Sequence, residues 1–278
     1  MIDIHAHISQ SRKPIPPEFK DAVRAYMFNT GVDVTHYGTD EDLAKGMKEN
    51  AVARACILPI ADSSLESAAK VNNFIRMMML QHSYIEGFAS VDPTSDGAER
   101  EVDRVLREEG LKGLVVDPRQ NFDFAGSDFW IVLEVAKALD AVIFVHSEYL
   151  SGDEYFDAED VNETLLSFPK LRFVFSISKS KGFILPEPNV YVDTAHATKE
   201  QLESALEAFG VEKILFGSDF KYNFYPQYEI SKIQQLGISE EEKDMILEGN
   251  AANILGLPFY KKSDFLDRIP FLKRFSSG

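Results

Sequence analysis

Residues 141–146 read AVIFVH, an uninterrupted apolar run that ends in a histidine. A strand with apolar side chains on both faces is typical of a parallel sheet that helices cover on both sides. Similar runs recur along the chain, and the predicted strands are 2–5, 53–59, 84–91, 112–117, 141–146, 171–177, 189–194 and 213–218. Because longer helical patterns separate most of them, the sequence predicts an α/β fold, a (β/α)8 TIM barrel.

The helices between these strands are marked by their first residues. Thr39 and Thr198 each precede an acidic first turn, and Ser239 with Glu242 has the spacing of a capping box. The predicted helices are 40–50, 64–81, 98–109, 128–139, 157–168, 198–209, 226–236 and 239–255. Residues 178–188 are too short and too rich in proline and glycine for an ordinary helix, so we expect a reduced crossover there.

The chain length fits one barrel domain, which commonly needs roughly 250 residues. We expect this domain to span 1–257, with 8–38 forming a long loop over the mouth of the barrel. The remaining 258–278 form a C-terminal extension that mixes aromatic and basic residues. We favour its packing along the barrel or in a homodimer over binding to a membrane surface.

The amino-acid composition limits the classes of molecule that the protein is expected to bind. A net charge of −16, from 29 basic and 45 acidic residues, argues against nucleic acid as a partner. The net charge does not indicate the substrate, and the small molecule that we expect as partner follows from the local site described below. The single cysteine, Cys56, lies in an apolar run and reads as a buried hydrophobe. The N-terminus lacks the pattern of a signal peptide and no stretch is apolar enough to cross a membrane, so we expect a cytoplasmic protein.

Two histidines close the first predicted strand. His5 and His7 are two residues apart, so on a strand both imidazoles point to the same side and could bind one metal ion. Two polar residues at a strand terminus are the plainer alternative. The metal reading gains support because the catalytic groups of barrels gather at the carboxyl ends of strands.

Two later strands end in residues of the same chemistry. His146 follows the fifth strand and Asp219 follows the eighth, which adjoins the first strand in a closed barrel. Asp219 could be a fourth metal ligand or take the proton of a metal-bound water. Taken singly, His146 reads as a core histidine and Asp219 as a helix cap, but together with His5 and His7 they favour a metal site.

These motifs resemble the amidohydrolase-related family of metal-dependent hydrolases and decarboxylases. The resemblance runs in family order over roughly residues 1–257. It rests on DIHAH (3–7), KG with DP (112–118), His146, VYVD (190–193), FGSD (216–219) and NAANIL (250–255). It implies one divalent metal ion, Zn²⁺ before Mn²⁺ or another, held by His5, His7, His146 and Asp219, with Asp219 also moving the proton.

The main departure from the family pattern lies at the end of the sixth strand. Relatives end the sixth strand in a histidine that takes part in catalysis, and Ile177 stands there in this chain. Isoleucine neither donates nor accepts a proton, so metal binding can persist where the family reaction does not. Ser176, Ser178 or Lys179 could take over if the strand is shifted by one residue.

Charged residues near the predicted mouth are candidates for binding a substrate carboxylate. They are Arg119 after the fourth strand, Lys179 after the sixth and Lys221 after the eighth. For Asp117, a turn residue is the preferred interpretation and a ligand of a second metal ion the alternative. His36 and His196 could reach the mouth, but a role in loop structure is the preferred interpretation of each, and His82 is expected at the opposite end of the barrel.

The leading hypothesis is a metal-dependent hydrolase that attacks a C–N or C–O bond of a small metabolite through a metal-activated water. The alternative within the family is a non-oxidative decarboxylase. Because of Ile177, a barrel that binds a metal or ligand without turnover also stays open. A structural barrel would instead hold its histidines by hydrogen bonds to one another or to the backbone.

Overall fold

Eight parallel strands form one sheet, in the order in which they follow one another along the chain. They are β1 (Ile2–Ala6), β2 (Arg54–Ile57), β3 (Ile85–Ser90), β4 (Gly113–Val116), β5 (Val142–Val145), β6 (Arg172–Ser176), β7 (Val190–Asp193) and β8 (Ile214–Leu215). This computed structural model describes residues 1–8, 38–59, 65–117, 120, 122–146, 157–176, 185–220 and 226–259. Each predicted strand is confirmed within two or three residues at its ends.

The sheet closes between its first strand and the segment that follows β8. The amide of Ile4 donates to the carbonyl of Phe216 at 2.9 Å, and the amide of His7 donates to Phe220 at 3.1 Å. Ala6 and Phe220 form a parallel bridge. The predicted TIM barrel is therefore confirmed, and the carboxyl ends of β1 and β8 lie side by side.

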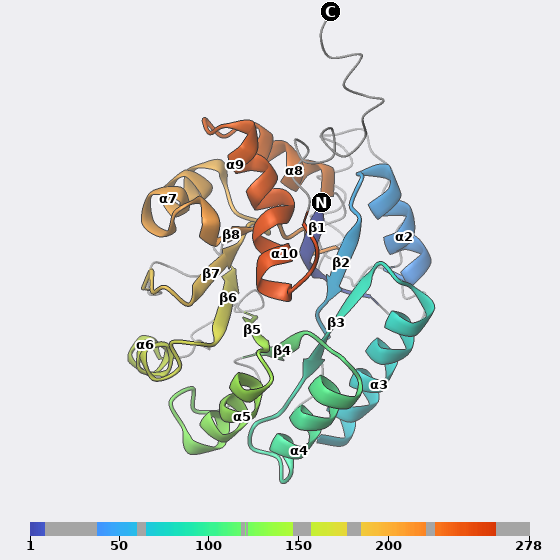
Figure 1. The fold of residues 1–278 in the computed structure, drawn as a ribbon, viewed down its shortest axis with the longest axis vertical. Helices are drawn as coiled ribbons and strands as arrows, with labels where there is room; N and C mark the ends of the chain where they lie inside the picture. Colours follow the sequence, from blue (N-terminus) through green and yellow to red (C-terminus); the bar gives the residue numbers. More distant parts are fainter. Residues whose placement is uncertain are drawn as a thin grey trace, which may run out of the picture.

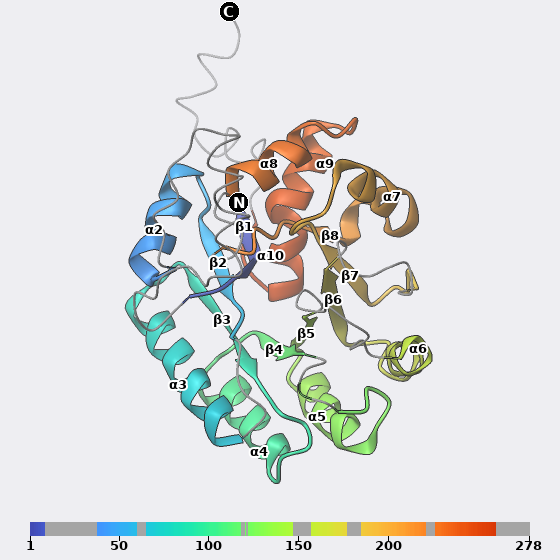
Figure 2. The ribbon, with the colours of Figure 1, turned by 180° about the vertical axis from the view of Figure 1, so that it is seen from behind.

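Helices surround the barrel (Figures 1 and 2). They are α2 (Asp40–Glu49), α3 (Leu65–Gln81), α4 (Ala98–Asp103), α5 (Ser127–Ala138), α6 (Ala158–Ser167), α7 (Lys199–Phe209), α8 (Pro226–Gln234), α9 (Glu240–Asp244) and α10 (Asn250–Leu255). Thr39, Thr198 and Ser239 each form the capping box that fixes the start of a helix. Two π-helical turns, Arg104–Glu108 and Met245–Gly249, interrupt the predicted helices 98–109 and 239–255.

Both faces of the strands are buried, as the apolar runs predict. In β5, Val142 and Phe144 belong to one hydrophobic cluster, while Ile143 and Val145 belong to another that includes residues of α5. Successive side chains of a strand point to opposite faces, so His146 continues the face of Val142 and Phe144. The ring of Phe144 packs edge-on against His5, with 4.8 Å between the ring centroids. This face therefore points into the barrel.

Several predicted features lie outside the described residues. They are the mouth loop apart from its first and last residues, the first part of the short crossover after β6, and the tail beyond residue 259. The division into a domain of 1–257 and an extension stays a prediction. None of the described helices is long and apolar enough to cross a membrane.

Candidate metal centre

His5 and His7 point from the end of β1 into the mouth of the barrel, and both are almost completely buried. The Nδ1 atom of His5 lies 2.8 Å from Oδ2 of Asp193, and the Nδ1 atom of His7 lies 2.7 Å from the carbonyl oxygen of Leu58. A carbonyl oxygen only accepts hydrogen bonds, so Nδ1 of His7 carries the proton. In neutral His7, Nε2 is then left with a lone pair.

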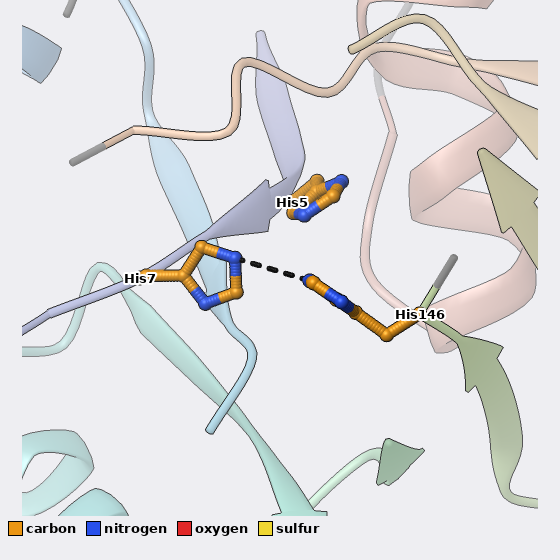
Figure 3. Close-up of side chains that lie close together, drawn as sticks. All are labelled: His5, His7 and His146. Atoms are coloured by element: carbon orange, nitrogen blue, oxygen red, sulfur yellow. Dashed lines mark hydrogen bonds between the residues drawn. The ribbon is translucent and has the colours of Figure 1, made fainter. Parts of the chain in front are cut away.

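His146 approaches these two residues from β5, as predicted. Figure 3 shows the three rings of His5, His7 and His146 turned toward one another, with Nε2 of His146 3.4 Å from Nε2 of His7. One ligand atom from each of the three histidines lies within 4.8 Å of the others. The residues that alternation and strand ends singled out are thus brought together.

Asp219 completes the cluster from the segment after β8. Its Oδ1 atom lies 3.2 Å from Nε2 of His7 and 3.7 Å from Nε2 of His5. Gly217 allows this approach, because a Cβ atom there would lie 2.9 Å from the Cβ of His5. The backbone of Asp219 has a φ of 50°, an uncommon left-handed conformation for a residue with a side chain. Its amide donates to the carbonyl of His5 at 2.8 Å.

The spacing of these atoms fits one small divalent cation. Ligands placed about 2.0–2.1 Å from a tetrahedral metal are about 3.3–3.4 Å from one another. The contacts of 3.2 Å and 3.4 Å around Nε2 of His7 are close to that separation. A single proton could satisfy one pair of these atoms, whereas a cation could satisfy three nitrogens and a carboxylate oxygen together.

The protonation of the cluster also suits a metal. Burial lowers the pKa of His7 despite the nearby carboxylate of Asp219, which favours the neutral imidazole that a metal requires. Burial alone would raise the pKa of Asp219, but the hydrogen bond from His196 and the contacts with His7 and His5 lower it below its usual value. The carboxylate is therefore ionised when the site is formed.

Asp3 anchors the segment that carries Asp219. Its carboxyl group accepts hydrogen bonds from the amide of Ser218 at 3.0 Å, from the Ser218 hydroxyl, and from the amide of His5 at 3.1 Å. Complete burial nevertheless raises the pKa of Asp3 to about 7. Asp3 thus links the end of β1 that carries His5 to the turn at Ser218.

Asp193, at the end of β7, is a partner that sequence reasoning missed. Besides His5, it accepts hydrogen bonds from the hydroxyl of Ser176 at 2.9 Å and from the amide of Ala195 at 2.8 Å. A carboxylate behind a metal-binding histidine fixes the tautomer and the orientation of the ring. The signal was present in VYVD, where Asp193 ends a strand as Asp219 does. The hydroxyl of Ser176 is thus used as a hydrogen-bond donor to this carboxylate. Ile177 lies outside the described residues.

His196 also contacts the cluster, although a loop residue was the preferred interpretation and a position at the mouth only the alternative. Its Nε2 atom lies 2.7 Å from Oδ2 of Asp219. The side chain of His196 is 37% exposed, whereas that of Asp219 is 2% exposed. His196 therefore connects the buried carboxylate to the surface of the site.

Of the other candidate residues, one borders the cluster, one lies far from it, and the rest are outside the described residues. Oδ2 of Asp117 lies 3.8 Å from Nδ1 of His146, so Asp117 borders the cluster. His82 precedes β3, at the opposite end of that strand from the site, and contacts Asp40. Arg119, Lys179, Lys221 and His36 lie outside the described residues, so their predicted roles stay predictions.

A family model described as amidohydrolase matches residues 2–257. The chain belongs to this amidohydrolase family. The recognition of the family from its motifs is thereby confirmed. No curated protein matches the chain.

Solved structures of several enzymes share the fold at low sequence identity. One is 5-carboxyvanillate decarboxylase LigW from Sphingomonas paucimobilis, with a TM-score of 0.67, 17% identity, and coverage of 92% of this chain and 99% of that chain. Another is dihydroxybenzoic acid decarboxylase from Polaromonas sp. JS666, with bound manganese and 2-nitroresorcinol. Its TM-score is 0.67 at 17% identity, and the match covers 92% of this chain and 96% of that chain. A third is the 4-oxalomesaconate hydratase LigJ from Rhodopseudomonas palustris. Its TM-score is 0.67 at 18% identity, and the match covers 92% of this chain and 95% of that chain.

Proposed function

We propose that this amidohydrolase-family protein is a metal-dependent enzyme that removes CO₂ from a small aromatic carboxylic acid without a redox step. The observation that carries the proposal is the convergence of three imidazoles and the carboxylate of Asp219 at the barrel mouth. Two of the enzymes that share the fold are decarboxylases of aromatic acids, which favours this reaction over hydrolysis, the leading hypothesis from the sequence.

The proposed metal ligands are His5, His7, His146 and Asp219. Imidazole nitrogens suit Zn²⁺, and the carboxylate is equally suited to Mn²⁺, which one of the similar enzymes binds. A bound divalent ion would supply a Lewis acid that withdraws electron density from an oxygen of the substrate. Asp193 and the carbonyl of Leu58 would keep His5 and His7 in the tautomers that present Nε2.

Asp219 is the proposed proton-transfer residue. In decarboxylation the bond between the ring carbon and the carboxylate breaks, CO₂ leaves, and the electron pair stays on the carbon until a proton replaces the lost group. The carboxylate of Asp219, which is ionised in the free site, would take up a proton from water and deliver it to the ring carbon. Arg119, Lys179 and Lys221 remain the proposed residues that bind the substrate carboxylate.

Hydrolysis of a C–N or C–O bond is the second candidate, because the same carboxylate could accept a proton from water. Membership in the amidohydrolase family favours it. A barrel without turnover has less support, since His196 places a second side chain capable of proton transfer beside Asp219.

An assay of two substrate panels separates these functions. Protein loaded with Mn²⁺ or Zn²⁺ is incubated with hydroxylated benzoic acids, including 2,6-dihydroxybenzoate and 5-carboxyvanillate, and separately with lactones and amides. We expect one CO₂ for each benzoic acid consumed, and no turnover after chelation or in Asp219→Asn. Hydrolysis without CO₂ would favour the second candidate, and no turnover in either panel would contradict both enzymatic functions.

A further inference from the structure

Two residues with left-handed backbones meet at the metal centre. The described residues other than glycine that have positive φ are Ala51, Asp140, His196 and Asp219. The last two, with φ of 56° and 50°, are hydrogen-bonded to each other through their side chains. Such conformations cost free energy in residues with a Cβ atom and persist where the surrounding structure enforces them.

Hydrogen bonds enforce the turn that presents His196. Thr194 exchanges hydrogen bonds with Gly217 across β7 and β8, its hydroxyl accepting from the amide at 3.1 Å and lying 3.3 Å from the carbonyl. The amide of Ala197 donates to the carbonyl of Thr194 at 3.1 Å. The buried ammonium of Lys232 on α8 donates to the carbonyl of Ala197 at 2.6 Å.

This turn determines how the two oxygens of Asp219 are used. Oδ2 is occupied by Nε2 of His196 at 2.7 Å, and Oδ1 faces His7 and His5. A carboxylate without such a partner can rotate, or turn both oxygens toward a cation. The contact with His196 commits Asp219 to offering one oxygen to the three histidines.

We propose that His196 is a positioning residue, which holds Asp219 so that only Oδ1 is presented to the metal. This inference rests on the proposed metal site. It assigns His196, from the end of β7, a role in metal binding that no pattern in the sequence indicated. Partners of this kind, which contact a metal ligand rather than the metal, typically change metal affinity by about 10–100-fold when removed.

Three variants test the proposal. His196→Gly removes the imidazole and relieves the left-handed backbone, while His196→Gln keeps an amide donor of similar reach. His82→Gly is the matched control, because His82 also pairs with an aspartate, Asp40, at 2.9 Å but lies before β3. Affinity for Mn²⁺ and Zn²⁺ is measured by competition with a chromophoric chelator, and the Tm of each metal-free protein is measured alongside.

We expect His196→Gly to bind either metal about 10–100-fold more weakly, with no fall in the Tm of the metal-free protein. His196→Gln should recover most of the affinity, and His82→Gly should bind as the wild type does. Equal affinity of His196→Gly and the wild type would overturn the role of His196 and leave the proposed function intact. A wild type that binds neither metal would instead overturn the proposed function.

Discussion

The imidazole of His5 is fixed by the carboxylate of Asp193, with 2.8 Å between Nδ1 and Oδ2. The two residues are 188 positions apart in sequence and meet because β7 and β1 both end at the mouth of the barrel. The hydroxyl of Ser176 donates to the same oxygen of Asp193. The orientation of a proposed metal ligand therefore depends on a residue that does not touch the metal.

Asp193→Asn should weaken metal binding about 10–100-fold. An amide nitrogen facing His5 would donate to Nδ1 and place the imidazole proton on Nε2, where the metal should bind. Chelator competition measures the change, and Asp103→Asn, at a surface pair with Arg107, serves as the control. Affinity unchanged from the wild type would show that Asp193 does not set the tautomer of His5.

Gly113→Ala should destabilise the barrel by about 3 kcal/mol or more. A Cβ atom at this position would lie 2.0 Å from the carbonyl oxygen of Val142 and 2.6 Å from the ring of Phe88. The first contact is with backbone of the neighbouring strand, which cannot move aside without breaking the β4–β5 ladder. Urea denaturation measures the loss.

Gly237→Ala provides the comparison for Gly113→Ala, because no atom lies within 4 Å of a Cβ built there. Its stability should lie within about 0.5 kcal/mol of the wild type. Equal stability of the two alanine variants would contradict the conclusion that β4 and β5 approach too closely at Gly113 to leave room for a Cβ atom.

The ionised side chain of Glu101 should make a contribution to the free energy of unfolding that is lost at acid pH. Burial raises its pKa, but hydrogen bonds from Arg104 and Asn72 outweigh burial and lower the pKa below the ordinary 4.5. A depressed carboxyl pKa adds stability that is present above the pKa of the unfolded chain and is lost as pH falls through the folded pKa. Glu101→Gln should therefore cost about 1–3 kcal/mol at pH 7 and progressively less below pH 4.5.

Urea denaturation of Glu101→Gln and the wild type between pH 3 and pH 7 checks this dependence. Glu66→Gln, at an exposed pair with Lys70, should show no measurable change. A difference between Glu101→Gln and the wild type that stays constant over this range would contradict the assignment.

Sequence periodicity predicted the features that depend on local pattern. Apolar runs such as 141–146 mark strands buried on both faces, and the alternation of His5 and His7 placed both rings on one side of β1. His146 and Asp219 followed because catalytic groups of barrels gather where strands end. These inferences need only the order of the strands and their direction.

The roles that were not predicted depend on contacts between distant turns. His196 reaches Asp219 through a left-handed backbone that Thr194 and Lys232 hold, and no local pattern of the sequence encodes it. Asp193 ends a strand and could have been included with Asp219. The π-helical turns in the helices after β3 and β8 also leave no signal in helical periodicity.

The central claim is that His5, His7, His146 and Asp219 hold a divalent metal ion. Elemental analysis of protein purified without a metal-affinity step, after incubation with Mn²⁺ or Zn²⁺, tests it most directly when the wild type is compared with a His5→Ala/His146→Ala double variant. We predict close to one equivalent of metal in the wild type and almost none in the variant. A wild type without metal, or a variant that retains the full equivalent, would contradict the claim.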